Sequence, residues 1–272
     1  MDVLGAASPL RPGHTRALAR PRVHFIYSHH VFDDEAAGYQ GMIRWLRELL
    51  EFVTYSEGCA RLREGRIDRP YGTVSFDDGL KNNLRAARML SEQGVRACFF
   101  VCPAFVGATD TPTLERFGRA LNAPPCEVMN WDELGELLAM GHEVGGHTMN
   151  HVNLGAVEPG VAQEEIVRCR EVLVSRLGPA AGEHFAWPYG TFGHITAAAA
   201  RAVFDCGFRT CTSAMRGAHG PELKGLERVC LRRDHVLARW PRAHVRHFMA
   251  ESARRMGPGS ADWPAEWAKT IG

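Results

Sequence analysis

Short apolar runs alternate along the chain with longer segments in which apolar residues recur at helical spacing. The runs Val23–Tyr27, Thr73–Phe76 and Ala97–Cys102 predict strands, and the last is continuously apolar, as expected of a strand buried on both faces. The segments Gly41–Glu51 and Glu164–Leu177 predict amphipathic helices. Further helices are predicted at 57–65, 82–94, 195–204 and 242–256, and further strands at 52–55, 184–190, 207–212 and 226–236. This alternation is typical of an α/β protein.

Two adjacent carboxylates follow the strand predicted at 73–76. Asp77 and Asp78 stand before Gly79, in a turn that opens the helix predicted at 82–94. Neighbouring carboxylates oppose each other's ionisation, so such a pair needs a positive partner, and a bound metal ion is a usual one. A solvated turn or a helix N-cap is the alternative for this stretch taken alone.

Two histidines follow a glycine-flanked, strand-like segment further along the chain. His147 and His151 are four residues apart, which on a helix would stack both imidazoles on one face and suit joint ligation of one cation. Each histidine taken singly is more typical of a surface position or of a hydrogen-bonded core position than of a metal ligand. With one carboxylate from the acidic turn, the pair predicts a three-residue metal site with open positions for water and substrate.

These motifs resemble those of the polysaccharide deacetylase family, carbohydrate esterase family four. Ser75–Gly79, His147–His151 and Trp187–Gly190 resemble its first, second and third motifs, in the same order and spacing. The resemblance runs from about His24 to Val236, and the segment Ser28–Val31 resembles an amino-terminal Tyr-His-x-Val, with the histidine retained and the tyrosine replaced. It implies a distorted (β/α) barrel of about seven parallel strands.

The resemblance also implies roles for the acidic turn and the two histidines. Asp78, His147 and His151 would bind one divalent metal ion, most readily Zn²⁺, with Co²⁺, Ni²⁺, Mn²⁺ or Fe²⁺ as alternatives. Asp77 would accept the proton of the attacking water, since its neighbour is occupied by the metal.

The third motif would help to bind the substrate and its oxyanion. By resemblance, a backbone N–H around Tyr189 stabilises the oxyanion, within a turn that also contains Trp187 and Pro188. The family often has an arginine near Ala186 or Trp187 that orients the catalytic aspartate, and this sequence has none there. Arg233, in a segment near the end of the resemblance, is the candidate replacement.

A histidine must protonate the departing amine, because an unprotonated amide nitrogen leaves poorly. The candidates are His235, beside Arg233, and His29, at the end of the first predicted strand. If the sheet is parallel, the carboxyl ends of its strands share one rim, so His29 would reach the same site as Asp77. The sequence leaves both candidates open.

The 272 residues fit one enzyme-sized domain. We place a flexible leader at 1–21, the catalytic domain at 22–256 and a C-terminal tail at 257–272, with an insertion at 104–129 that is either a surface excursion or a lid over the site. Hydrophobic residues make up 45% and charged residues 23%, and the formal net charge of +1 argues against binding to nucleic acid.

The sequence contains no apolar stretch of membrane-spanning or signal-peptide length. The eight cysteines form no Cys-x-x-Cys pair and are expected to be reduced. We therefore expect a cytoplasmic, metal-dependent deacetylase that removes the N-acetyl group of an amino sugar, in a soluble conjugate or biosynthetic intermediate. The alternatives are a catalytically silent carbohydrate-binding protein on the same fold, and a metal amidohydrolase or deformylase acting on a non-polymer amide.

Overall fold

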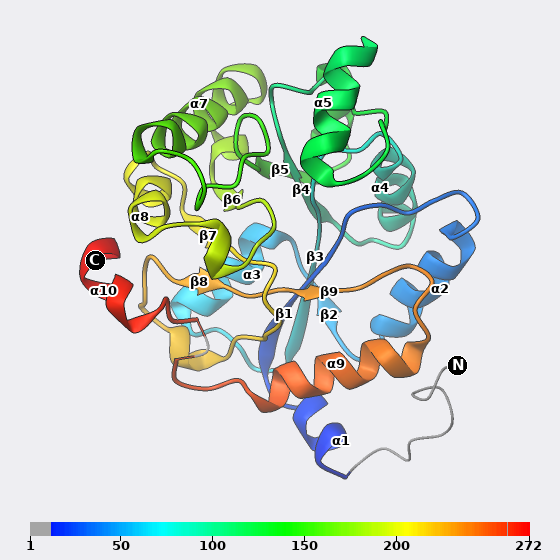
Figure 1. The fold of residues 1–272 in the computed structure, drawn as a ribbon. Coiled ribbons are helices and arrows are strands. Elements are labelled where there is room, and N and C mark those ends of the chain that lie inside the picture. The colour runs from blue at the N-terminus through cyan, green and yellow to red at the C-terminus, as the bar shows by residue number, and fades with distance from the viewer. Residues whose placement is uncertain (1–11, 260) are drawn as a thin grey trace.

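A parallel sheet forms the centre of the molecule (Figure 1). The computed structural model describes residues 12–259 and 261–272. The strands are β1 (Arg22–Ser28), β2 (Glu51–Phe52), β3 (Pro70–Phe76), β4 (Ala97–Val101), β5 (Glu143–Gly146), β6 (His184–Ala186), β7 (Thr210–Thr212), β8 (Cys230–Leu231) and β9 (Asp234–His235). Their order is β8-β7-β6-β5-β4-β3-β1-β9, with β2 beside β3, and all these strand pairs are parallel.

The segment Cys230–His235 closes the sheet into a barrel. Its two short strands lie at opposite ends of the strand order, β8 on β7 and β9 on β1, although only two residues separate them in the chain. The single strand predicted at 226–236 is therefore wrong, because this segment crosses from one edge of the sheet to the other instead of running along either. The distorted barrel is confirmed, with eight strands in its main order rather than the expected seven.

Helices surround the strands, with α2, α4, α7 and α8 on the outside of the barrel (Figure 1). The helices are α1 (Pro12–Leu18), α2 (Ala36–Leu46), α3 (Tyr55–Glu64), α4 (Asn83–Glu92), α5 (Thr111–Leu121), α6 (Trp131–Ala139), α7 (Pro159–Leu177), α8 (Ala197–Asp205), α9 (Arg242–Arg254) and α10 (Ala268–Ile271). Short 3₁₀ helices are η1 (Pro179–Gly182), η2 (Phe192–His194), η3 (Pro221–Leu223) and η4 (Ala265–Trp267).

Local signals fix several helix ends. The hydroxyl of Thr54 accepts the Glu57 N–H at the start of α3, and Gly65 ends that helix at a φ of 72°. Asn130 and Glu133 form a reciprocal capping box at the start of α6. The helix predicted at 41–51 corresponds to α2, which spans Ala36–Leu46 and so starts and ends about five residues earlier. Its first turns belong to the helix because they contain Tyr39, which is buried.

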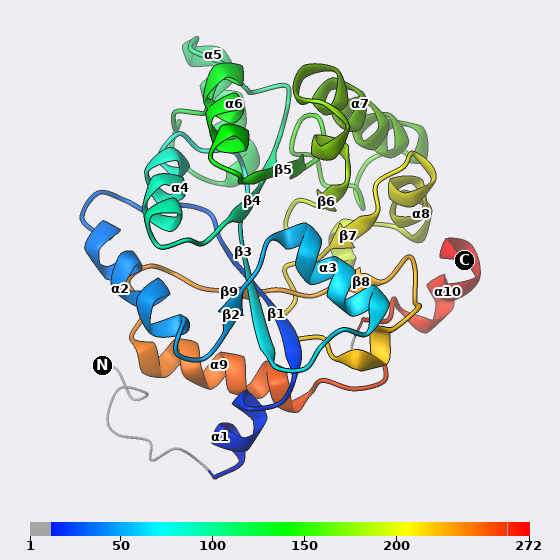
Figure 2. The ribbon, with the colours of Figure 1, turned by 180° about the vertical axis from the view of Figure 1, so that it is seen from behind.

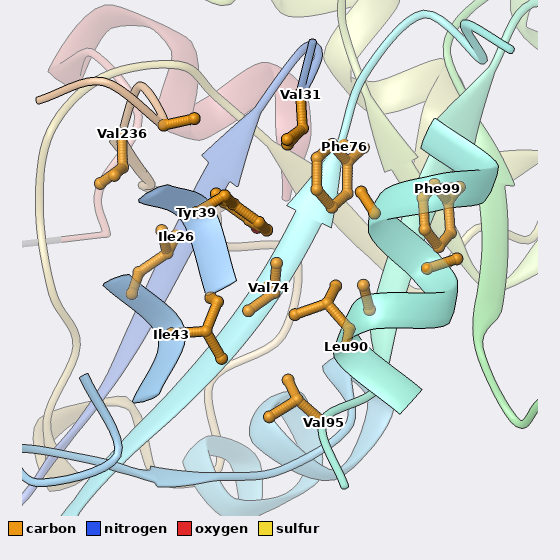
Figure 3. Close-up of a cluster of buried hydrophobic side chains, with 14 of the residues drawn as sticks. Ile26, Val31, Tyr39, Ile43, Val74, Phe76, Leu90, Val95, Phe99 and Val236 are labelled. Carbon is orange, nitrogen blue, oxygen red and sulfur yellow. The ribbon is translucent and has the colours of Figure 1, made fainter. Parts of the chain in front are cut away.

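Apolar side chains pack on both faces of the sheet, which explains the continuously apolar β4. On the outer face, Ile26 and Val74 lie against Ile43 of α2 and Leu90 of α4 (Figure 3). Inside the barrel a second cluster is built around Phe25, Phe100, Tyr55 and other residues. Successive residues of a strand therefore pack into two different apolar clusters, one outside the barrel and one inside it.

Helix α3 lies across the amino-terminal opening of the barrel. The carboxylate of Glu143, at the start of β5, accepts the backbone N–H groups of Tyr55 (2.6 Å) and Ser56 (3.1 Å) in its first turn. Figure 2 shows α3 in front of the sheet in the rear view. The amino-terminal end is thus covered, which leaves the carboxyl-terminal rim as the end where a site can open.

Both ends of the described chain pack on the barrel domain. Helix α1, within the predicted leader 1–21, packs on α9, where Arg20 donates a hydrogen bond to the Ala253 carbonyl (3.1 Å). The remaining leader residues, 1–11, lie outside the described residues. In the predicted tail, α10 packs against α8. The division into leader, domain and tail stays a prediction.

Two further sequence expectations concern cysteines and membranes. The eight cysteines are all unpaired in the structure, and six of them are buried. Within the described ranges, no helix combines the length and the apolar character that crossing a bilayer would require.

Candidate metal centre and active site

The predicted site residues meet at the carboxyl-terminal rim of the barrel. Asp77 and Asp78 directly follow β3, His147 and His151 follow β5, and Tyr189 follows β6. The rim is where loops collect in such barrels, because every parallel strand delivers its carboxyl end there. Segments far apart in sequence are thereby brought to one place.

Asp78, His147 and His151 form the one group of metal-binding type found among the described residues. Asp78 Oδ1 lies 3.5 Å from His147 Nε2 and 3.4 Å from His151 Nε2, and all three side chains are buried. One ligand atom from each residue lies within 4.8 Å of the others. These separations suit neighbouring ligands of a single small ion.

The hydrogen bonds around this triad leave its ligand atoms free. His147 Nδ1 donates to the Ala186 carbonyl (2.7 Å), which fixes the tautomer and leaves Nε2 as a lone-pair donor. Burial lowers the pKa of His147 to about 4, so the ring is neutral as a metal ligand must be. Asp78 Oδ1 is buried and accepts no hydrogen bond from any described residue. A buried carboxylate oxygen without a partner is costly, so the residues fit a bound cation.

The two histidines lie on a loop rather than on the helix that their spacing suggests, so the helical interpretation is wrong. Thr148 and His151 take left-handed conformations, with φ values of 61° and 54°, which reverse the chain and aim both rings at Asp78. Asp78 and Tyr189, with φ values of 77° and 61°, share this conformation. Four of the six non-glycine residues with positive φ in the described chain thus lie at this site, where backbone strain commonly concentrates.

Glu165 of α7 holds the histidine loop in place. Its carboxylate accepts the backbone N–H (2.8 Å) and the side-chain amide (2.7 Å) of Asn150, and its carbonyl accepts the Met149 N–H (3.1 Å). No local sequence signal singles out Glu165, because a glutamate on an amphipathic helix is typical of an exposed charged position.

Arg233 and Asp77 form a bidentate pair inside the barrel. Arg233 Nη1 lies 2.7 Å from Asp77 Oδ1, and Nη2 lies 2.9 Å from Oδ2. Burial raises the pKa of Asp77, but the charge of Arg233 outweighs it, with smaller help from His147, and the pKa falls to about 2. Asp77 is therefore ionised at neutral pH, and each of its oxygens keeps a lone pair that Arg233 does not use.

The barrel interior fixes the guanidinium of Arg233. Its Nε donates to the Ser213 carbonyl (2.9 Å), Nη1 also donates to Ser75 Oγ (3.2 Å), and its carbon lies 4.2 Å from the centre of the Tyr27 ring. Arg233 belongs to the segment Cys230–His235 that closes the barrel, and its side chain reaches Asp77 inside it. No local sequence pattern predicts this contact. Its role as the replacement for the missing arginine stays a prediction.

The two candidate acids, His29 and His235, lie side by side on this rim. His29 Nδ1 is 3.3 Å from His235 Nε2, so one ring donates a hydrogen bond to the other. His235 stacks on Tyr27, with ring centres 4.8 Å apart. Burial, with the nearby His29 and Arg216, lowers the pKa of His235 to about 4. His235 is therefore neutral at neutral pH.

A buried network of Asp234, His24 and Arg216, which the sequence does not predict, supports His235. Asp234 accepts hydrogen bonds from His24 (2.6 Å) and Arg216 (3.2 Å), and Arg216 donates in addition to the His235 carbonyl (3.1 Å). The one local signal for Asp234 is its position between Arg233 and His235. Its partners Arg216 and His24 lie 18 and 210 residues away in the chain, so no short-range pattern connects them.

The third motif forms a tight turn beside the metal-binding residues. Trp187 and Pro188 are buried, and the ring of Tyr189 lies 5.1 Å from that of His151. The Tyr189 backbone N–H donates to no described residue, which leaves it available to a ligand. At Gly190, φ is 66° and a side chain would collide with Ala214, so the turn requires glycine.

The insertion at 104–129 forms a wall beside the site. It contains α5, and Phe105 and Phe117 stack in its own apolar cluster with ring centres 4.3 Å apart. The hydroxyl of Tyr189 donates to the Ala120 carbonyl of α5 (2.8 Å), which ties the insertion to the third motif. The insertion is therefore packed against the site rather than extended into solvent.

Part of the chain is similar in sequence to a curated deacetylase. A curated chitooligosaccharide deacetylase from Bradyrhizobium sp. (strain ANU 289) is 28% identical over 134 residues, which is 46% of this chain and 52% of that protein. The chain thus spans about half the length of this curated relative.

Solved structures share the fold. IcaB from Ammonifex degensii has a TM-score of 0.68 at 20% identity, covering 86% of this chain and 98% of that one. The Streptococcus pyogenes deacetylase PplD, solved in complex with acetate, has a TM-score of 0.64 at 15% identity, covering 85% and 98%.

The sequence profile of the family described as polysaccharide deacetylase matches residues 66–210. This range contains the acidic turn, the histidine loop and the third motif, and excludes His29, Arg233 and His235. Because the match covers more than half of the 272 residues, the chain belongs to the polysaccharide deacetylase family.

Proposed function

We propose that this protein is a metal-dependent deacetylase that hydrolyses the N-acetyl group of an amino sugar. The observation that carries the proposal is the pairing of Asp77 with Arg233 directly beside the triad of Asp78, His147 and His151. A protein that only bound sugar would have no use for an oriented, ionised carboxylate next to three metal-binding side chains. The similarity to a chitooligosaccharide deacetylase supports an N-acetylated sugar as substrate.

Metal and base have separate roles in this scheme. A divalent ion held by Asp78, His147 and His151, with Zn²⁺ the first choice for this donor set and Co²⁺, Ni²⁺, Mn²⁺ or Fe²⁺ as alternatives, would polarise the amide carbonyl and acidify the attacking water. Asp77 accepts the proton of that water on a lone pair that Arg233 leaves free. Arg233 keeps this carboxylate ionised and fixed in orientation.

The remaining groups act on the oxyanion and the amine. The free N–H of Tyr189 donates to the developing oxyanion, and Trp187 and Pro188 hold the turn that presents it. His29 protonates the leaving amine, because His235, with a pKa lowered to about 4, rarely carries an extra proton at neutral pH. His235 instead positions the His29 ring through their hydrogen bond.

The first test measures acetate release from a panel of N-acetylated amino sugars, sugar conjugates and non-sugar amides. Metal-stripped, zinc-reconstituted and Asp77→Asn proteins are compared, with metal content quantified in each. Zinc is expected to restore release, and Asp77→Asn to keep the metal while losing about 10²–10⁴-fold in kcat. Metal binding without any hydrolysis would favour the carbohydrate-binding alternative, and release from non-sugar amides alone would favour an amidohydrolase.

A second prediction concerns the roles of His29 and His235. His29→Gln should lower kcat by about 10²-fold or more, since it removes the proton donor. His235→Gln should lower kcat less, because it removes only a positioning contact. The reverse order of effects would make His235 the acid.

The soluble cytoplasmic conjugate expected from the sequence stays a prediction. It concerns the size of the substrate, which acetate release from a panel graded by chain length addresses directly.

A further inference from the structure

Four large apolar side chains are markedly exposed in the described structure, and two of them flank the metal-binding residues. Phe32 is 49% exposed and Tyr189 39%, while Leu226 (48%) and Val161 (46%) lie on other parts of the surface. Phe32 follows β1 and Tyr189 follows β6, so both lie on the carboxyl-terminal rim. In the strand order, β3, β4 and β5 stand between β6 and β1, which places the metal-binding residues between the two aromatic side chains.

The exposure of Phe32 belongs to an ordered loop. The preceding residue, Val31, is fully buried and lies beside Phe76 at the end of the sheet (Figure 3). The Phe32 N–H donates to Glu35 Oε2 (3.2 Å), and its carbonyl accepts the Glu35 N–H (3.0 Å). The loop is thus anchored on both sides of Phe32, and the ring is held outward.

The ring of Phe32 packs on His30, which also follows β1 on the same rim. The rings of His30 and Phe32 are 4.2 Å apart at their centres, with an angle of 37° between their planes. His30 directly follows His29, whose Nδ1 lies 3.3 Å from Nε2 of His235 on the rim. The pair therefore extends outward from the site along the rim.

We propose that Phe32 and His30 form a platform for a second sugar residue, next to the N-acetylated residue that is cut. A sugar ring has an apolar face of C–H groups that packs on an aromatic ring, and hydroxyls at its edge that bond to a group such as imidazole. The substrate is then an oligosaccharide that crosses the rim from the Tyr189 side to the Phe32 side. This inference rests on the proposed function and adds a subsite to it.

The test uses N-acetylglucosamine and its β-linked oligomers with the zinc-loaded protein. For the unaltered protein, KM should fall on going from the single sugar to the oligomers. Phe32→Ala should raise the oligomer KM about tenfold, which corresponds to about 1.4 kcal/mol of binding energy. It should leave kcat, metal content and hydrolysis of the single sugar unchanged, and Phe32→Trp should restore the oligomer KM.

Leu226→Ala is the matched control, because that side chain is equally exposed but lies before β8, toward the opposite end of the barrel. The platform would be disproved if Phe32→Ala left the KM for the oligomers unchanged, or if Leu226→Ala raised it by the same factor. If no sugar releases acetate, the proposed function fails. The platform is then tested separately by calorimetric binding of the oligomers to zinc-loaded Asp77→Asn protein, with and without Phe32→Ala; equal affinities would overturn it.

Discussion

At the scale of single residues, Asp77 and Asp78 are neighbours in sequence with opposite surroundings. Asp77 continues β3 and meets Arg233 inside the barrel, whereas Asp78, at a φ of 77°, turns to face His147 and His151. Like charges this close oppose each other's ionisation unless each has its own positive partner, which is Arg233 for Asp77 and would be the metal ion for Asp78. The separate partners let two adjacent carboxylates take different roles.

Arg233 provides the first prediction at this scale. In Arg233→Met, burial acts on Asp77 without opposition, so its pKa rises well above the present value of about 2. The acidic limb of the kcat/KM profile should therefore move to higher pH. The unfolding free energy should fall by about 3–5 kcal/mol, because a buried carboxylate is left unpaired.

Arg233→Lys serves as the comparison, since it keeps the charge and loses the bidentate geometry. It should shift the acidic limb less than the methionine variant, with zinc content unchanged in both. An acidic limb at the same pH in all three proteins would show that Arg233 does not set the protonation of Asp77.

At the scale of elements, the histidine loop depends on a helix far from the metal-binding residues in sequence. The loop contains two strained residues, Thr148 and His151, and Glu165 of α7 accepts two hydrogen bonds from Asn150 in its centre. Strained backbone persists only where its surroundings determine it. Helix α7 therefore contributes to the metal site without supplying a ligand.

Glu165→Gln should lower zinc affinity by about 10- to 100-fold, the usual effect of losing an outer-sphere support. Competition with a chromophoric chelator measures the affinity. Glu164→Gln is the matched control, because its side chain is exposed one position earlier on the same helix. Equal affinities for the two variants would contradict a supporting role for Glu165.

At the scale of the whole molecule, buried neutral histidines help to bind the barrel together. His142 Nδ1 accepts the Ala97 N–H (3.0 Å), and His219 Nε2 accepts the Arg232 N–H (2.8 Å). Burial lowers the pKa of His142 to about 4 and of His219 to about 3. Protonation of either ring would break a hydrogen bond and bury a charge.

Acid should therefore destabilise the fold well before carboxylates are protonated. Histidines of the unfolded chain, with a pKa of about 6.5, bind protons as the pH falls below that value, whereas the buried native rings stay neutral. The free energy of unfolding therefore decreases as the pH is lowered from about 6.5 to the native pKa values. The decrease is about 1.4 kcal/mol per pH unit for each histidine. Urea unfolding of metal-stripped protein between pH 7 and pH 4.5 measures this slope.

His219→Gln should remove the contribution of one histidine to this slope, because glutamine does not titrate. The fold should be kept, since the glutamine amide oxygen can still accept the Arg232 N–H. A stability that is flat over this pH range would contradict the neutral state of the buried rings.

The sequence by itself determined the α/β architecture and singled out the residues of the candidate metal site. Hydrophobic periodicity is a local property, so it located the strands and helices and showed that Asp77, Asp78 and the two histidines follow strands. Because parallel strands deliver their carboxyl ends to one rim, the meeting of these residues follows from the pattern.

Only the tertiary structure decided how the site is completed. Arg233 meets Asp77 across 156 positions, and His29 meets His235 across 206, because the segment Cys230–His235 crosses from one edge of the sheet to the other. The histidine spacing suggested a helix, and the structure has a strained loop held by α7 instead. These outcomes depend on strand order and long-range packing, which short-range periodicity does not encode.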